Sequence, residues 1–259
     1  ALFRYIFNTR FGIEPALNLL KQDSTYMNTE IKIAIPYYLS YNKIIKTYYY
    51  NATSSVIGNN SELSNNLQHL ADIKKNGFGC GTKIWKIDYI FNPRRGYLFE
   101  LDIDGGDKTS TISIQSDTLM KQKIDKNKYV TCSSHSNIYI PVSKQTVFVI
   151  ENRMALIHCK TLFANESFRM GGFKDLKGFD ENSIYCTRYA MLNFEYRLLF
   201  QRNSNIYTFF NGMIYENNSL KEKISDTPYG FGIGLNIQSH NNIFSISYAY
   251  GHQFNNKIM

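Results

Sequence analysis

Long apolar runs are absent from this sequence of 259 residues. A helix that spans a bilayer needs about 18 to 20 consecutive apolar residues, so a helical membrane protein is excluded. Strands that cross a bilayer need only about 9 to 11 residues of alternating polarity, and a mean hydropathy of -0.33 is compatible with them. The low mean hydropathy is therefore no argument that the protein is soluble.

Signatures of metal and catalytic sites are also scarce. The four cysteines, Cys80, Cys132, Cys159 and Cys186, lie far apart, with no C-x-x-C pair and no histidine at ligand spacing. Their disulfide state stays open at this level. The histidines are isolated, and neither a G-x-S-x-G elbow nor a phosphate-binding loop occurs. We expect no enzyme, no catalytic residue, no metal site and no cofactor.

The basic charge balance does not indicate a nucleic-acid partner. The formal net charge is +8, but Lys and Arg are scattered between apolar positions and form no basic helix or long run. A lumen and loop surface that tolerates acidic lipid fits this distribution, with ordinary solvated charge as the alternative.

Aromatic residues are abundant. The chain is 43% hydrophobic and 15% aromatic, with 20 Tyr and 18 Phe against one Trp, which excludes a disordered chain. Tyrosine suits a water boundary, because its ring is apolar and its hydroxyl is polar. This composition indicates a membrane interface.

The dominant sequence period is two, as in β-strands. In 97–104, apolar residues alternate with a face that carries Glu100, Asp102 and Asp104. These carboxylates line a wet lumen in this interpretation; a calcium site is the alternative, although alternate strand residues lie about 7 Å apart. The stretches 230–238 and 244–251 predict a hairpin with its turn at 240–242. Similar alternation occurs at Thr29 to Ile35, Trp85 to Phe91, Phe148 to Leu156 and Leu192 to Leu198, giving about eleven segments.

The connections between these segments differ in length. Long polar connections are expected at Asn59 to Lys75, Thr109 to Lys128 and Tyr215 to Thr227, and short turns near Asn203 and Asn241. This asymmetry is typical of outer-membrane barrels. Several segments alternate for nine or more residues, whereas soluble strands average about five or six. A membrane barrel is therefore favoured over a soluble sandwich or lipocalin-like barrel.

One glycine-rich segment carries a family resemblance. Residues 168–182, FRMGGFKDLKGFDEN, resemble the loop-six signature of the BamA/TamA family. The Gly171-Gly172 pair matches its glycines, and Lys177-Gly178-Phe179 stands where the family has Arg-Gly-Phe. An ordinary glycine-rich surface loop is the alternative interpretation of this segment alone.

Further landmarks follow in the order of the family. Residues 87–96 resemble its Asp...Asn-Pro-Arg-Arg-Gly hairpin turn, and strand-like segments follow at 193–197, 207–212, 229–235 and 243–251. The chain is similar, from Gly77 to Gly251, to the barrel of this outer-membrane assembly and surface-antigen family.

The resemblance implies a role for three residues in docking the loop in the lumen. In the family, the loop folds back inside the barrel and its Arg pairs with acidic residues of neighbouring strands. Lys177 stands at the Arg position, Glu195 matches one acidic partner, and Asn211 stands at the other. Lysine lacks the bidentate fork of arginine. The alternative for Glu195 is a pair with Arg197.

These observations predict an all-β fold, an antiparallel transmembrane β-barrel that is integral to the outer membrane. About 11 to 12 strands are visible, fewer than the family's sixteen, and we expect 1–259 to be a single barrel domain without a POTRA module. The chain is then a partial one, or a reduced member whose open edges another protein covers. Unpaired backbone groups in lipid cost several kcal/mol each. No signal peptide is visible, so Ala1 is expected to follow a processing site or begin a fragment.

The resemblance also implies a function. It is insertion or assembly of outer-membrane proteins, or translocation of a passenger, through a barrel to whose edge a partner strand adds. The alternative is an inactive or accessory structural subunit of an outer-membrane complex; a small-solute channel or a soluble β-protein is less favoured. Expected partners are outer-membrane lipid or lipopolysaccharide and other outer-membrane or periplasmic proteins.

Overall fold

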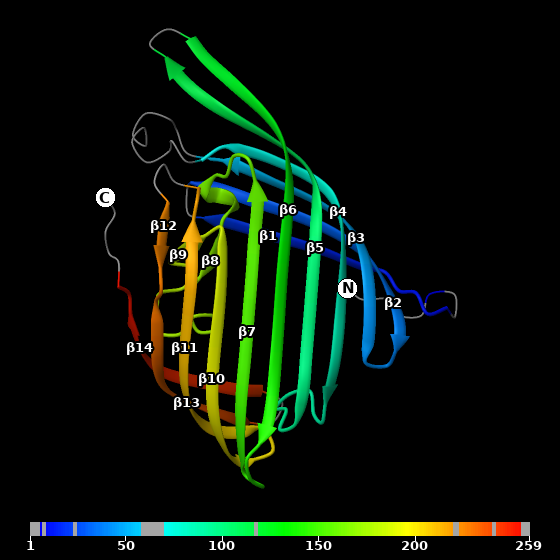
Figure 1. Cartoon of the computed structure of the whole chain (residues 1–259), viewed down its shortest axis with the longest axis vertical. Coiled ribbons are helices and arrows are strands. Elements are labelled where there is room, and N and C mark those ends of the chain that lie inside the picture. Colours follow the sequence, from blue (N-terminus) through cyan, green and yellow to red (C-terminus); the bar gives the residue numbers. More distant parts are fainter. Residues whose placement is uncertain are drawn as a thin grey trace.

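The computed structural model describes residues 6, 9–22, 25–57, 70–116, 119–219, 223–239 and 242–254. Within these ranges, twelve strands form one antiparallel sheet, which curves around an inner space (Figure 1). Its strands are β1 (Glu14–Gln22), β2 (Tyr26–Ser40), β3 (Lys43–Val56), β4 (Asp72–Ile87), β5 (Gly96–Ser116), β6 (Leu119–Pro141), β7 (Thr146–Cys159), β10 (Arg188–Gln201), β11 (Ser204–Asn217), β12 (Ile224–Asp226), β13 (Tyr229–Ser239) and β14 (Asn242–His252).

The sheet is open. Its strands follow the order β1-β2-β3-β4-β5-β6-β7-β10-β11-β13-β14, and the short β12 pairs with β11 beside this path. In the described part of the chain, β1 and β14 are the two ends of this order and do not pair with each other. The prediction of an antiparallel all-β barrel sheet with about eleven to twelve strands is confirmed, and so is its incomplete closure.

Alternation along the strands separates two faces. On β11, Tyr207, Phe209 and Met213 are buried while Ile206 and Phe210 are 45% and 49% exposed. Successive residues of a strand point to opposite faces, so the first set faces inward and the second faces outward. Large apolar side chains are exposed on the outer face of most strands, as in a barrel whose outer surface contacts lipid.

The segment between β7 and β10 folds back against the inner face. It contains a 3-10 turn, η3 (Ala164–Glu166), and two short paired strands, β8 (Phe168–Met170) and β9 (Ile184–Cys186). Met170, Leu176 and Ile184 of this segment form a buried cluster with Met191 of β10 and Met213 of β11. Apolar burial therefore holds the segment inside the curved sheet, as Figure 1 shows.

The prediction of a long connection at Thr109 to Lys128 is wrong. Backbone pairing of β5 and β6 continues through this region to the pair Ser116 and Leu119, so both strands extend past the rest of the sheet (Figure 1). A two-stranded ribbon satisfies its own backbone groups by cross-strand pairing, so a polar sequence does not by itself end it. Polarity indicated a loop where the chain forms a ribbon.

Other boundaries also differ from the expectation. The segment Trp85 to Phe91 leaves the sheet after Ile87, and the turn that follows is held by Asp88, whose Oδ1 accepts the N–H groups of Arg94 and Arg95 at 2.9 and 3.2 Å. Burial opposes ionisation of Asp88, but these hydrogen bonds outweigh it and hold the pKa of the carboxyl below its usual range.

Parts of the three long connections lie in strands. The first connection ends within β4, and the third contributes the end of β11 and β12. The predicted hairpin of β13 and β14 is confirmed by continuous pairing from Tyr229 with His252 to Ser239 with Asn242, while the turn residues His240 and Asn241 lie outside the described residues. No helix within the described ranges has the length and apolar character needed to span a bilayer.

Candidate functional site

The tip of the inward loop is shaped by glycines with positive φ. Gly171, Gly172 and Gly178 have φ values of +110°, +105° and +99°. Residues with a Cβ rarely adopt this conformation, so glycine allows the two sharp excursions here. The three glycines that the sequence singled out thus lie at the bends of the loop.

The loop backbone rests directly on two strands. A Cβ at Gly178 would lie 2.8 Å from the backbone nitrogen of Gly251 on β14, and a Cβ at Gly230 on β13 would lie 2.1 Å from the carbonyl oxygen of Lys177. Phe179 packs beside Gly251 and against the buried cluster of the loop. Only glycine permits this approach, so the strand glycines form the surface on which the loop tip sits.

Lys177 and Glu195 are brought together. Lys177 Nζ lies 3.1 Å from Glu195 Oε1, both side chains are 9% exposed, and the ammonium also lies 4.9 Å from the ring centroid of Phe209. Glu195 Oε2 accepts Arg197 Nη2 and Nε at 2.6 and 2.9 Å, while Asn193 Nδ2 donates to Oε1 at 3.1 Å. Both expected partners of Glu195 are thus present, one on each oxygen, and Arg197 supplies two charge-assisted hydrogen bonds to Oε2.

Asn211 is buried at the same level of the sheet but does not join this pair. It lies opposite Asn193 in the register of β10 and β11. Neither its side-chain oxygen nor its nitrogen has a hydrogen-bond partner among the described residues. Lys177 therefore has one carboxylate partner at this level.

The base of the loop has a second set of polar contacts on the opposite wall. Glu166 pairs with Lys75 of β4 at 2.6 Å and with Lys108 of β5, and its Oε1 accepts the N–H of Phe163 at 2.9 Å. All three charged side chains are nearly fully buried. Sequence reasoning missed this cluster because Lys75 fell in a segment interpreted as a loop and Lys108 lay between the expected strand 97–104 and the next such segment. Both lysines sit on the inward rows of their strands.

Asn165 and Arg169 extend this attachment. Asn165 Nδ2 donates to Ser54 Oγ of β3 at 2.6 Å and to the carbonyl oxygen of Ala71 at 2.8 Å. Arg169 Nη1 lies 2.6 Å from Gln22 Oε1 at the end of β1. Since Gly178 touches β14, the loop contacts both terminal strands of the open sheet.

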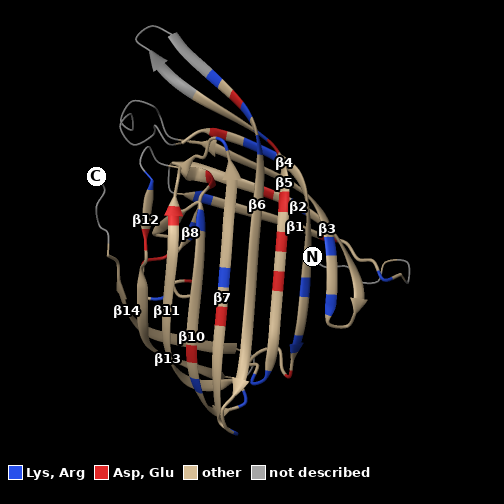
Figure 2. Cartoon of the chain, in the orientation of Figure 1, with Lys and Arg blue, Asp and Glu red and all other residues tan. Residues whose placement is uncertain are grey.

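The acidic strip on β5 is matched by cations and a hydroxyl of neighbouring strands. Glu100 pairs with Lys83 at 2.5 Å, Asp102 with Lys46 at 2.8 Å, and Tyr48 OH donates to Asp104 at 3.3 Å. Figure 2 shows this run of acidic residues on β5 beside basic residues on β3 and β4. The strip is a polar lumen wall in which Glu100 and Asp102 are ion-paired and Asp104 is hydrogen-bonded.

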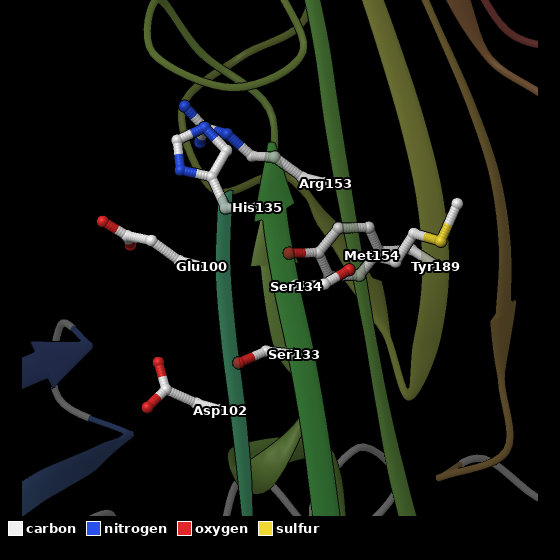
Figure 3. A pocket seen from close by; sticks show the side chains of 8 residues that line it. All are labelled: Glu100, Asp102, Ser133, Ser134, His135, Arg153, Met154 and Tyr189. Atoms are coloured by element: carbon white, nitrogen blue, oxygen red, sulfur yellow. The ribbon is translucent and has the colours of Figure 1, made fainter. Parts of the chain in front are cut away.

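A cavity of about 340 Å³ adjoins this wall. Figure 3 shows Glu100 and Asp102 projecting to one side of their strand, with His135 and Arg153 close together above them. Glu151 Oε1 lies 3.1 Å from His135 Nε2 and 2.7 Å from Arg153 Nε, and Arg153 also pairs with Asp175 of the loop. The polar groups here are engaged with one another and tie the loop to β7.

The four cysteines are free. In the part of the chain that the structure describes, no three His, Cys, Asp or Glu side chains are grouped as metal ligands would be.

Residues 4–258 match the Omp85 superfamily domain. The chain belongs to the Omp85 superfamily. The match spans nearly the whole sequence, so it includes the docked loop, the open sheet and both terminal strands. As a BamA/TamA-type barrel, this Omp85 chain has the fold that its sequence landmarks indicated.

A solved structure shares this fold. The structure of BamA from Haemophilus ducreyi lacking POTRA domains 1-3 is similar with a TM-score of 0.68 and 13% sequence identity. The match covers 96% of this Omp85 chain and 57% of that chain, so the present sequence spans little more than half of the BamA chain. The β domain of the Bordetella autotransporter BrkA aligns over 94% of this chain and 90% of that chain, with 9% identity and a TM-score of 0.42. A score this low does not establish a shared fold. No curated protein matches.

Proposed function

We propose that this Omp85 chain is a single β-barrel domain, 1–259, that is integral to the outer membrane and inserts other outer-membrane proteins or translocates a passenger. The observation that carries the proposal is the match to the superfamily domain over 4–258. The open sheet supports it, because β1 and β14 each pair with one strand only among the described residues, and a sheet edge of this kind can accept a strand of a client.

The docked loop fits this role. It contacts β1 through Arg169 and β14 through Gly178, so it lies where it can influence the distance between the two terminal strands. A client strand that adds to either edge would have to enter between them. Proposed partners are outer-membrane lipid or lipopolysaccharide and other outer-membrane or periplasmic proteins.

Depletion of the protein in its native cell tests this function. Folded outer-membrane barrels are quantified by heat-modifiable gel mobility and mass spectrometry after depletion. A broad loss of folded barrels is expected, since an assembly factor acts on many clients. Unchanged barrel levels together with loss of one co-purifying envelope complex would exclude the general assembly role.

The second candidate function is that of an accessory structural barrel. It is favoured by Lys177 in place of the family's Arg and by Asn211, whose buried amide has no hydrogen-bond partner among the described residues. A single lysine pair holds the loop tip less firmly than an arginine fork to two carboxylates. The same depletion distinguishes it, because an accessory barrel affects one complex only.

A further inference from the structure

Three lysines project from the outer surface of the sheet, one near the start of β4 and two on the part of β6 that lies level with it. Lys74, Lys126 and Lys128 are all exposed. Strand alternation places Lys74 on the same face as Phe78, which is 74% exposed, and the other two on the same face as Val130, which is 46% exposed. The lysines therefore share the face that carries the outer apolar side chains.

Strand register places these residues in parallel rows across β3 to β6. The first row is apolar, and within it the rings of Tyr49 and Phe78 lie 5.5 Å apart. The next two rows, toward the end that carries the long β5-β6 ribbon, are polar. The rows are Tyr49, Phe78, Gly105 and Val130; then Asn51, Asn76, Asp107 and Lys128; then Thr53, Lys74, Thr109 and Lys126.

The boundary between the apolar and polar surface falls between the first and second rows. The hydroxyl of Tyr49 hydrogen-bonds to Asn76 Oδ1 at 3.3 Å, so its polar end points across the boundary toward the second row. Tyrosines with this orientation form the girdles of membrane barrels, with headgroups at the level of the hydroxyl. The lysines of the second and third rows thus lie at headgroup level.

Charge pairing differs between the outer and inner faces. The inward lysines Lys46, Lys75, Lys83, Lys108 and Lys177 each pair with a carboxylate. By contrast, within the described residues none of the three outward lysines forms an ion pair with a carboxylate. Asp107 is opposite Lys128 in register and is exposed, so the two polar rows hold three lysines and one aspartate.

We propose that Lys74, Lys126 and Lys128 bind the phosphate groups of lipid headgroups in the adjoining leaflet. Strand spacing separates Lys126 from Lys128 by about 7 Å and from Lys74 by about 10 Å, so one phosphorylated headgroup can contact more than one lysine. The ammonium groups supply compact charge to phosphate. The apolar row next to the lysines contacts the acyl chains of the same lipid. A soluble phosphate or a nucleic acid has no acyl chains, so this row favours a lipid. The inference rests on the membrane placement proposed above and names the lipid chemistry that this face recognises.

The test measures lipid binding by the folded chain 1–259 in detergent micelles, using native mass spectrometry with titrated diphosphoryl lipid A and its monophosphoryl form. The variant replaces Lys74, Lys126 and Lys128 with Gln. Because the variant removes three positive charges that attract lipid phosphate, at least a tenfold loss of affinity for the diphosphoryl lipid is expected. The wild-type chain is expected to prefer the diphosphoryl form.

The matched control replaces three exposed lysines at the opposite ends of the strands, Lys43, Lys86 and Lys144, with Gln. It removes the same charge from the other rim and is expected to keep wild-type affinity. Heat-modifiable mobility verifies that every variant is folded.

Equal losses in both triple variants would reduce the effect to net charge and overturn the proposal. No loss in the first variant, or displacement of the lipid by millimolar inorganic phosphate, would overturn it as well. If depletion leaves the levels of other folded barrels unchanged, the assembly role is excluded, but the lipid-binding result is not affected. The two proposals can therefore fail independently.

Discussion

At the scale of single residues, the docked loop depends on how one carboxylate is shared. Glu195 Oε1 accepts hydrogen bonds from Lys177 and Asn193, and its Oε2 accepts from Arg197. Because Arg197 remains when Lys177 is removed, Glu195 is never left uncompensated. The contribution of Lys177 is therefore that of a charge-assisted hydrogen bond and not of a whole buried ion pair.

Lys177→Ala is expected to weaken docking of the loop tip by about 1 to 2 kcal/mol, which raises the undocked population several-fold. Limited proteolysis of the folded barrel checks this, with faster cleavage expected within 173–182. Lys174→Ala is the matched control, because Lys174 is an exposed lysine of the same loop. Lys177→Arg should retain protection. An unchanged digestion pattern for Lys177→Ala would show that the pair does not hold the tip.

At the scale of elements, the loop has two attachments on different walls. Its tip lies on β10, β13 and β14, and its base lies on β3, β4 and β5 through Asn165 and Glu166. The base attachment depends on buried charge, because Glu166 neutralises two lysines that have no other carboxylate partner in the described structure.

Glu166→Gln is expected to loosen the loop base by about 3 kcal/mol or more, because it leaves two buried ammonium groups without a carboxylate. Hydrogen–deuterium exchange measured on peptides covering 161–170 checks this, and faster exchange is expected there. Glu100→Gln serves as the control, since its pair with Lys83 is partly exposed and contributes at most about 1 kcal/mol. Comparable acceleration in both variants would contradict a specific anchor at Glu166.

At the scale of the whole molecule, the docked loop occupies the inner space of an open sheet. It is held from both walls and touches both terminal strands. Its position therefore affects both the inner space and the gap between β1 and β14. Gly230 and Gly251 have no side chain and so leave room on the sheet for the loop backbone. Displacing the loop should therefore change a property of the entire barrel.

Gly230→Ala is expected to raise ion conductance in planar bilayers, because its Cβ would lie 2.1 Å from the carbonyl oxygen of Lys177 and must displace the loop tip. Gly212→Ala on the neighbouring strand is the control, since its Cβ meets nothing closer than 4.0 Å. Both variants make the same chemical change in the sheet. Equal conductance of the two would mean that the tip does not obstruct the lumen.

The sequence by itself determined the strands and the motif. Side-chain alternation depends only on the geometry of an extended chain, so Tyr97 to Asp104 and Gly230 to Gln238 were identified as strands without knowledge of their neighbours. Glu195 was paired with Lys177 through the resemblance to a family, and Gly171, Gly172 and Gly178 were singled out in the same way. The structure places Lys177 and Glu195 side by side.

Only the tertiary structure decided where polar segments go and what the loop touches. The ribbon of β5 and β6 exists because two polar segments satisfy each other's backbone groups, which no local pattern reveals. Lys75, Lys108 and Glu166 are separated by 33 and 58 residues in sequence, and Gly251 meets Gly178 from the last strand of the sheet. Contacts of this kind depend on the register of several strands at once, whereas alternation fixes only the face on which each residue lies.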